Sequence, residues 1–106
     1  MQVDEMVQMT RELMELFKQV EPREWDATAM ATELNAETGT LSDTIMIKEG
    51  YRQLRPGTAL DLEDDIVDVM FMLIRIALHY DIDFEAAYRQ MVEETRAKIK
   101  KRIEDA

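Results

Sequence analysis

The stretch LEDDIVDVMFMLIRIALHY, residues 62–80, combines a nearly continuous apolar run with side chains that can bind a metal ion. Charged residues are almost never fully buried unless they are paired or bind a metal. At about 100° per residue, the polar side chains of this stretch fall on one side of a helix that is apolar elsewhere. This polar stripe consists of Asp65, Asp68, Arg75 and His79.

A second polar row lies earlier in the chain, at spacings of i, i+4, i+7 and i+11. It consists of Glu33, Glu37, Thr40 and Thr44. If two antiparallel helices face each other through these rows, Glu37 meets Asp65 and Asp68, with Glu33 one turn away. Carboxylates that share a low-dielectric cleft repel one another, so such a cluster needs a divalent cation. Hard oxygen ligands suit Mg²⁺ or Mn²⁺, and the sequence therefore predicts a metal site formed by these four carboxylates.

The same residues also fit a purely structural interpretation. Asp65 and Asp68 can pair with Arg75 or Lys48 in an ion-pair network that binds no metal. The acidic residues 61, 63 and 64 need no function, because the positive end of the helix dipole favours carboxylates in a first turn. Spacing alone leaves both interpretations open.

Four helices are expected to position these residues. Apolar residues at helical spacing predict an amphipathic helix over 3–20, before Pro22. Asp26 is the expected cap of a second helix that runs to about Lys48. After the turn QLRPGT, Asp61 caps the third helix, and a last helix runs from Phe84 to about Ile103. The predicted fold is therefore an all-α, four-helix bundle-like protomer.

Composition limits the functions that the chain can have. Its 106 residues predict one domain, residues 1–106, and three Gly and two Pro agree with an all-α class. A net charge of −10 argues against a polynucleotide or an anionic membrane as partner. There is no cysteine, the acidic N-terminus does not resemble a signal peptide, and no apolar run is long enough to span a bilayer. We therefore expect a cytoplasmic protein with no membrane partner.

The apolar circumference of residues 66–78 predicts that the protein is an oligomer. A four-helix monomer of this length is too small to cover the third helix on all sides. A second copy of the chain is the simplest cover.

Two segments resemble a known family. These are AETGTLSD, residues 36–43, and LEDDIVDVMFMLIRIALHYDIDFEAA, residues 62–87. They resemble the MazG-like nucleoside triphosphate pyrophosphohydrolases of the all-α NTP pyrophosphatase superfamily, over roughly residues 25–100. That family shows a Glu-x-x-Glu pair within EVGEL, a Glu-x-x-Asp pair at the start of a very apolar helix, and a gIDLeeA sequence where the last helix begins.

The resemblance assigns roles by position. Glu37 matches the first Glu of the family motif, and Asp65 and Asp68 match the Glu-x-x-Asp pair, which makes these three the catalytic candidates. Thr40 stands where the family has its second Glu. Gln90 and Glu94 stand near the family's phosphate-contacting Lys and Asn, so the chain departs from the pattern at three positions. Glu33 is the residue that can replace the missing carboxylate.

What the resemblance implies is a Mg²⁺-dependent hydrolase that cleaves a (d)NTP to (d)NMP and pyrophosphate, as part of nucleotide-pool housekeeping. The substrate-binding candidates are Trp25, which can stack on the base, and the cations Lys48, Arg75 and Arg96. For Trp25 a hydrophobic staple at the start of the helix is an equally good interpretation, and for Arg96 a solvated helix face is the default. Family members form homodimers or homotetramers whose helices complete one another's bundle.

A second functional hypothesis uses the same fold without turnover. The departures at Thr40 and Glu94 suggest a non-catalytic helical dimer that binds a nucleotide or a metal. The preferred base and sugar, the number of metal ions, and the choice between dimer and tetramer stay open at this level.

Overall fold

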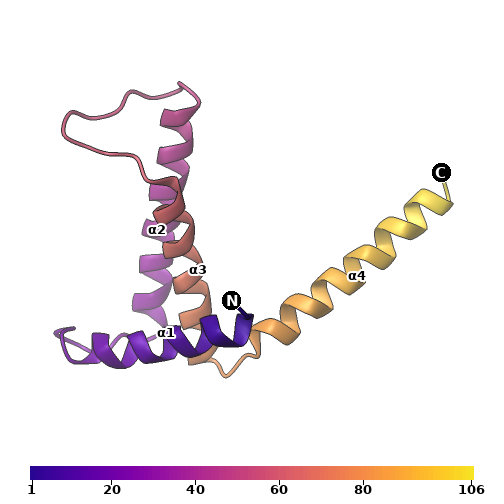
Figure 1. Ribbon diagram of the computed structural model, residues 1–106, viewed down its shortest axis with the longest axis horizontal. Helices are drawn as coiled ribbons and strands as arrows, with labels where there is room; N and C mark the ends of the chain where they lie inside the picture. Colours follow the sequence, from indigo (N-terminus) through magenta and orange to yellow (C-terminus); the bar gives the residue numbers. More distant parts are fainter.

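The computed structural model describes all 106 residues and contains four α-helices and no strand (Figure 1). This confirms the predicted all-α class and the four helices. Their bounds are Val3–Lys18 for α1, Ala27–Lys48 for α2, Leu62–His79 for α3 and Phe84–Glu104 for α4.

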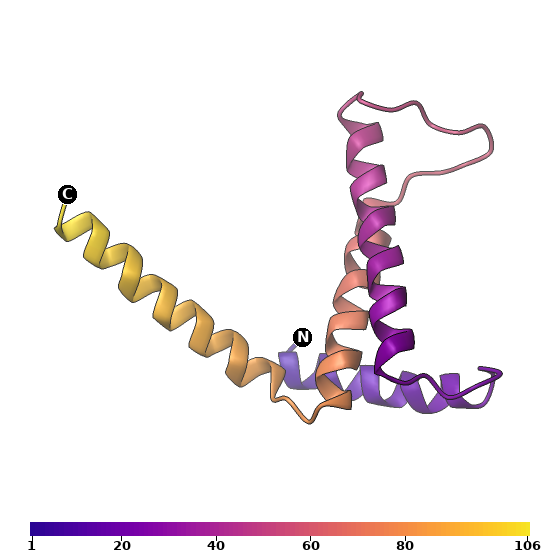
Figure 2. The same ribbon diagram turned by 180° about the vertical axis from the view of Figure 1, so that it is seen from behind.

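The helices α2 and α3 form an antiparallel pair, which we call the stem (Figures 1 and 2). The side chain of Asp26 accepts a hydrogen bond from the backbone N–H of Ala29 at 2.9 Å, and that of Asp61 accepts one from Asp64 at 3.0 Å. Both predicted caps are thereby confirmed, because each satisfies an N–H that the first turn of a helix leaves without a partner. The caps fix where the two facing rows of polar residues begin.

The first helix crosses the end of the stem that holds the start of α2 and the end of α3 (Figure 1). It ends at Lys18, so the expected end at residue 20 is wrong by two residues. The backbone N–H groups of Gln19 and Val20 bond the carbonyls of Leu16 and Phe17, three residues back, which tightens the chain into a turn. This turn carries the chain toward the start of α2.

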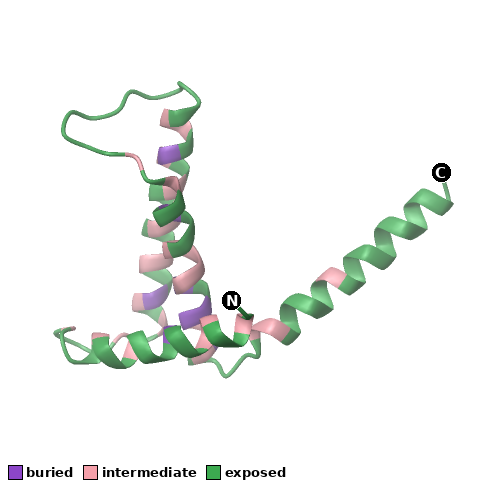
Figure 3. Cartoon of the chain, in the orientation of Figure 1, coloured by how far each residue is buried: buried purple, intermediate pink, exposed green.

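The core is small and half of it is polar. The buried apolar residues are Met30, Met72, Ile74 and Ala77, and the buried polar residues are Thr10, Thr44, Asp65 and Arg75. They lie along the stem and where α1 crosses it (Figure 3). Of the polar stripe of α3, Asp65 and Arg75 are buried, Asp68 is half-buried and His79 is exposed. The structure must therefore supply partners for Asp65 and Arg75.

The fourth helix projects away from the other three (Figures 1 and 2). None of its residues is buried, although it carries apolar side chains at helical spacing (Figure 3). No helix of the protein combines the length and the apolar character needed to cross a membrane.

Candidate functional site

Carboxylates from α2 and α3 converge in the stem. Burial raises the pKa of Glu37 above its usual 4.5, and a hydrogen bond with Glu33 and the negative charges of Asp68, Glu33 and Asp65 raise it further. The two rows are therefore close enough for their charges to interact, but the carboxylates that lie together closely enough to hold a metal ion are Asp64, Asp65 and Asp68, without Glu33 or Glu37. The neighbouring negative charges make it harder for Glu37 to ionise.

Asp64 belongs to the same cluster. One carboxylate oxygen from each of Asp64, Asp65 and Asp68 lies within 4.8 Å of the other two. The pKa of Asp68 is raised from its usual 3.8, first by burial, then by the charges of Asp64 and Asp65 and a hydrogen bond with Asp64. From the sequence, Asp64 is expected only as a residue of an acidic first turn. Its position four residues before Asp68, on the same helix face, was the signal for this second role.

Asp65 is held in place by a threonine of the opposite helix. The hydroxyl of Thr44 donates a hydrogen bond of 2.5 Å to Oδ2 of Asp65, and both side chains are buried. Thr44 was recognised as part of the polar row but not as a site residue. Thr40 behaves differently, because it is exposed and its hydroxyl donates to the carbonyl of Ala36 in its own helix, at 3.2 Å.

A cavity of about 490 Å³ lies beside this acidic cluster. On α2 it is lined by Gly39, Thr40 and Thr44, and on α3 by Asp64 and Asp65; the segment Thr58–Asp61 closes one side. A Cβ placed on Gly39 would meet no atom within 4 Å, so this glycine leaves the wall of the cavity open. Cavities of this volume hold small-molecule ligands in other proteins.

The donor set fits a hard divalent cation. Mg²⁺ binds oxygen at 2.0–2.1 Å, so two oxygens on opposite sides of the ion are about 4.2 Å apart. The oxygens of the three aspartates lie within 4.8 Å of one another, somewhat farther apart than in a Mg²⁺ site, so the side chains must move closer together to bind the ion. All of these donors are carboxylates, which suit Mg²⁺ or Mn²⁺.

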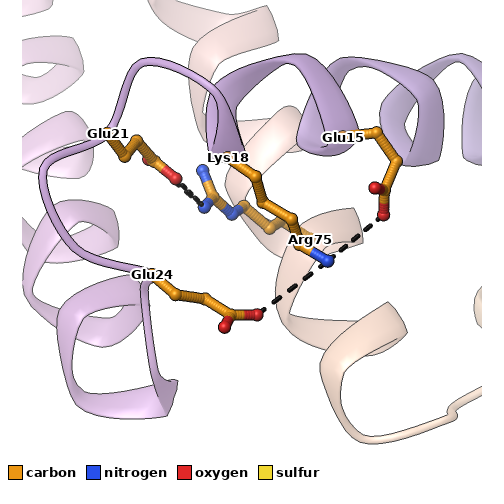
Figure 4. Close-up of polar contacts among 5 residues, drawn as sticks. All are labelled: Glu15, Lys18, Glu21, Glu24 and Arg75. Carbon is orange, nitrogen blue, oxygen red and sulfur yellow. Dashed lines mark hydrogen bonds and ion pairs between the residues drawn. The ribbon is translucent and has the colours of Figure 1, made fainter.

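Arg75 belongs to a different cluster, at the crossing of α1 and α3. Its Nη2 donates to both carboxylate oxygens of Glu21, at 3.1 and 3.3 Å, and its guanidinium lies 4.6 Å from the ring centre of Trp25 and 5.7 Å from that of Phe17. The side chains of the ion pair are only 5% and 11% exposed, and Nε of Arg75 is buried without a partner (Figure 4). The sequence analysis missed Glu21, which lies in the turn after α1 and outside any periodic pattern.

The contacts of Arg75 exclude the ion-pair network that was one of the two interpretations of the polar stripe. Neither Asp65 nor Asp68 forms an ion pair with Arg75 or Lys48, so that structural network is wrong. Arg75 lies seven residues beyond Asp68, or about 10 Å along the helix, and its charge is neutralised by Glu21. The candidate substrate residues Arg75 and Trp25 therefore pack against each other and not against the acidic cluster.

The other two candidate cations form no ion pair with the acidic cluster within one chain. Lys48 is exposed at the end of α2, four residues or about 6 Å along the helix beyond Thr44, which bonds Asp65. Arg96 is on α4, where it lines a groove of about 480 Å³ with residues of α1 and with Met70. The amide of Gln90 donates to Glu94 at 2.9 Å on the exposed surface of the same helix.

Comparisons of the chain with protein-family models, with curated proteins and with solved structures gave no match. The resemblance to the MazG-like pyrophosphohydrolases therefore stays a prediction that rests on the motif residues themselves.

Proposed function

We propose that the protein is a Mg²⁺-dependent nucleoside triphosphate pyrophosphohydrolase, which acts in the cytoplasm and cleaves a (d)NTP to (d)NMP and pyrophosphate. The observation that carries the proposal is the cluster of Asp64, Asp65 and Asp68, whose carboxylate oxygens lie within 4.8 Å of one another. Glu37 of the facing helix has a pKa raised by its burial and by the charges of Glu33, Asp65 and Asp68. Mutually repelling carboxylates are costly in the free protein, and a divalent cation removes that cost.

The residues have separate tasks in this proposal. Asp64, Asp65 and Asp68 hold the cation, and Glu37 lies across the cleft from them with Glu33 beside it. Mg²⁺ neutralises triphosphate charge and polarises a water molecule for attack on phosphorus. Thr44 fixes the orientation of Asp65 through the buried hydrogen bond. The cavity next to Gly39 has room for part of the substrate.

The test is to incubate the protein with Mg²⁺ and a panel of canonical and deoxynucleoside triphosphates, and to measure pyrophosphate. Asp68→Asn keeps the shape of the side chain and removes one anionic ligand, so we expect weaker Mg²⁺ binding and loss of turnover. Asp105→Asn makes the same charge change at the end of α4 and should leave both unchanged. Parental Mg²⁺ affinity and turnover in Asp68→Asn would contradict the proposed site.

A second candidate function, a non-catalytic dimer that binds a nucleotide or a metal, is favoured by one observation. The hydroxyl of Thr40, which stands where the family motif has its second carboxylate, is bonded to the backbone of its own helix. A Thr→Glu change at position 40 tests it, because Thr40 lines the cavity with Asp64 and Asp65. We expect Thr40→Glu to raise Mg²⁺ affinity in calorimetric titration, and to raise turnover if the chain is a weak enzyme. Tighter metal binding with no pyrophosphate from either form would favour the non-catalytic candidate.

The proposal includes a homodimer or homotetramer, as the resemblance implies. The exposed apolar side chains of α3 support this, among them Ile66 and Val67, with 50% and 57% of their surface exposed. No polynucleotide or membrane partner forms part of the proposal.

A further inference from the structure

The surface of the single chain is too large for its mass. A compact monomer of 12.4 kDa exposes about 6,100 Å², whereas this chain exposes 8548 Å². Its radius of gyration is 17.7 Å, compared with about 13 Å for a compact domain of this length. The excess is about 2,400 Å² per chain, or about 4,800 Å² for a pair, which lies in the range that obligate homodimers bury.

The fourth helix carries an exposed apolar stripe. Its members are Phe84, Tyr88, Met91, Val92, Ile99 and Ile103, which share one side of the helix. Tyr88 is 59% exposed and Ile99 is 50% exposed, on a helix of which no residue is buried. Helices in proteins are stabilised mainly by packing of such a stripe, so α4 lacks a partner in the single chain.

A matching stripe lies on α3. Ile66, Met70 and Leu73 follow at i, i+4 and i+7, on the side of the helix opposite Asp68 and Arg75. The polar side of α3 faces α2 and the turn after α1, so this apolar side is left partly uncovered, and Ile66 and Leu73 are exposed. Met70 also forms part of the apolar groove in the angle between α3 and α4.

The connection between α3 and α4 directs α4 away from its own α3. The N–H of Asp81 donates to the carbonyl of Leu78 at 3.2 Å, and that of Ile82 to Ala77 at 2.8 Å. One residue later, Asp83 caps α4 by accepting from the N–H of Ala86. Because both ends of this four-residue connection are hydrogen-bonded, α4 extends away from the stem at a wide angle (Figures 1 and 2).

The distribution of charge along the chain indicates which helix packs on the apolar stripe of α3 and in which direction it runs. Residues 84–106 carry six basic and five acidic side chains, whereas residues 1–83 carry seven basic and eighteen acidic ones. Between positions 95 and 103 there are five basic residues and no acidic one, and the start of α3 is acidic. A helix with a basic C-terminal half fits an acidic helix start when the two run antiparallel.

We propose that α4 of each chain packs antiparallel on the apolar stripe of α3 in a second copy, so that the two chains exchange their fourth helices. If Tyr88 lies beside the second copy's Leu73, the common rise of 1.5 Å per residue places Ile99 level with Leu62 and Lys98 level with Glu63. A two-fold axis makes the arrangement reciprocal and closed. This inference concerns assembly and does not depend on the proposed hydrolysis.

The first test measures mass by light scattering at micromolar concentration. We expect an assembly of two chains, or a multiple of two, and dissociation to single chains in Ile99→Glu. Ala97→Glu adds the same charge to the opposite side of α4 and should leave the assembly intact. Circular dichroism shows whether Ile99→Glu keeps its helices. A monomeric parent chain, or an assembly that Ile99→Glu leaves unchanged, overturns the proposal.

The second test identifies which α3 each α4 covers. The natural chain has no cysteine, so Leu73→Cys combined with Tyr88→Cys introduces the only two thiols. Under mild oxidation we expect disulfide-linked pairs of chains on a non-reducing gel, and no link when Leu73→Cys is combined with Ala97→Cys. A disulfide within one chain would show that α4 folds back onto its own α3. That result, or the absence of any disulfide in the first variant, overturns the exchange.

Discussion

At the scale of single residues, the threonines of α2 differ more than their sequence suggests. Thr44 and Thr40 are one helical turn apart, yet Thr44 donates to the buried Asp65 of the facing helix and Thr40 donates to its own backbone. The hydroxyl of Thr44 is therefore the one that stabilises a buried carboxylate.

This difference predicts the stability of two matched variants. Thr44→Val leaves a buried carboxylate without its donor, which costs about 1–3 kcal/mol in free energy of unfolding. Thr40→Val removes an exposed hydroxyl with the same change of shape and should stay within about 0.5 kcal/mol. Urea denaturation in the presence of EDTA measures both. Equal stabilities would show that the hydrogen bond to Asp65 contributes nothing.

The raised pKa values of Glu37 and Asp68 predict how stability depends on pH. A carboxylate whose pKa is higher in the folded than in the unfolded state contributes stability that is fully present at low pH. That contribution is lost as pH rises from about 4 through the raised pKa, since the folded state then loses protons that it binds more tightly. Metal-free protein at neutral pH therefore contains an unrelieved repulsion.

Comparison of the parent protein with Asp68→Asn isolates this effect. Asparagine resembles the protonated aspartate, so the two proteins should be similarly stable near pH 4, and the variant should become the more stable one as pH rises. Saturating Mg²⁺ should reverse the order at neutral pH, because only the parent then keeps its full ligand set. Chemical denaturation between pH 4 and 8, with EDTA or with Mg²⁺, checks both signs. A constant difference across this pH range would contradict the raised pKa of Asp68.

At the scale of helices, the local signals in the sequence were sufficient for most of the fold. Asp26 and Asp61 each cap the helix that the sequence assigned to them, because a cap depends on residues three positions apart. The polar rows of α2 and α3 also meet as helical periodicity predicted. These features depend only on near neighbours or on a regular repeat.

The partner of Arg75 could not be predicted in the same way. Glu21 lies 54 residues earlier, in an irregular turn, and the two meet only because α1 crosses the end of the stem. Periodicity within one helix gives no information on the crossing of another. Trp25 has its neighbour Arg75 for the same reason.

The ion pair predicts how strongly α1 and its turn are held to α3. Glu21→Gln leaves the guanidinium of Arg75 buried without a counter-charge, which should cost about 3–5 kcal/mol. Glu85→Gln removes one partner of the exposed pair with Arg89 and should cost about 0–1 kcal/mol. Denaturation measures the difference, and hydrogen exchange should show faster exchange in α1 of the first variant only. Similar costs for the two variants would mean that aromatic packing alone holds α1 in place.

At the scale of the whole molecule, half of the buried residues are polar, and large apolar side chains are exposed on α1, α3 and α4, among them Leu16, Ile66 and Ile99. This distribution is the reverse of what a stable monomer needs. The sequence indicated that α3 needs a cover, but it did not indicate that α4 leaves its own stem, because that depends on the bonded connection after His79. The proposed assembly covers apolar side chains of α3 and α4 that the single chain leaves exposed.

The proposed register of α4 on α3 of the second copy also predicts how changes of charge affect the assembly. Lys98 of α4 is expected beside Glu63 of the second copy, so Lys98→Glu or Glu63→Lys alone places like charges together and should weaken the assembly. The double variant restores opposite charges in the reverse order and should recover most of the affinity, which sedimentation at several protein concentrations measures. At 1 M salt the Debye length falls to about 3 Å, so the single variants should then approach the parent. Two single variants whose effects simply add in the double variant would show that these residues are not neighbours, and that α4 packs in another register.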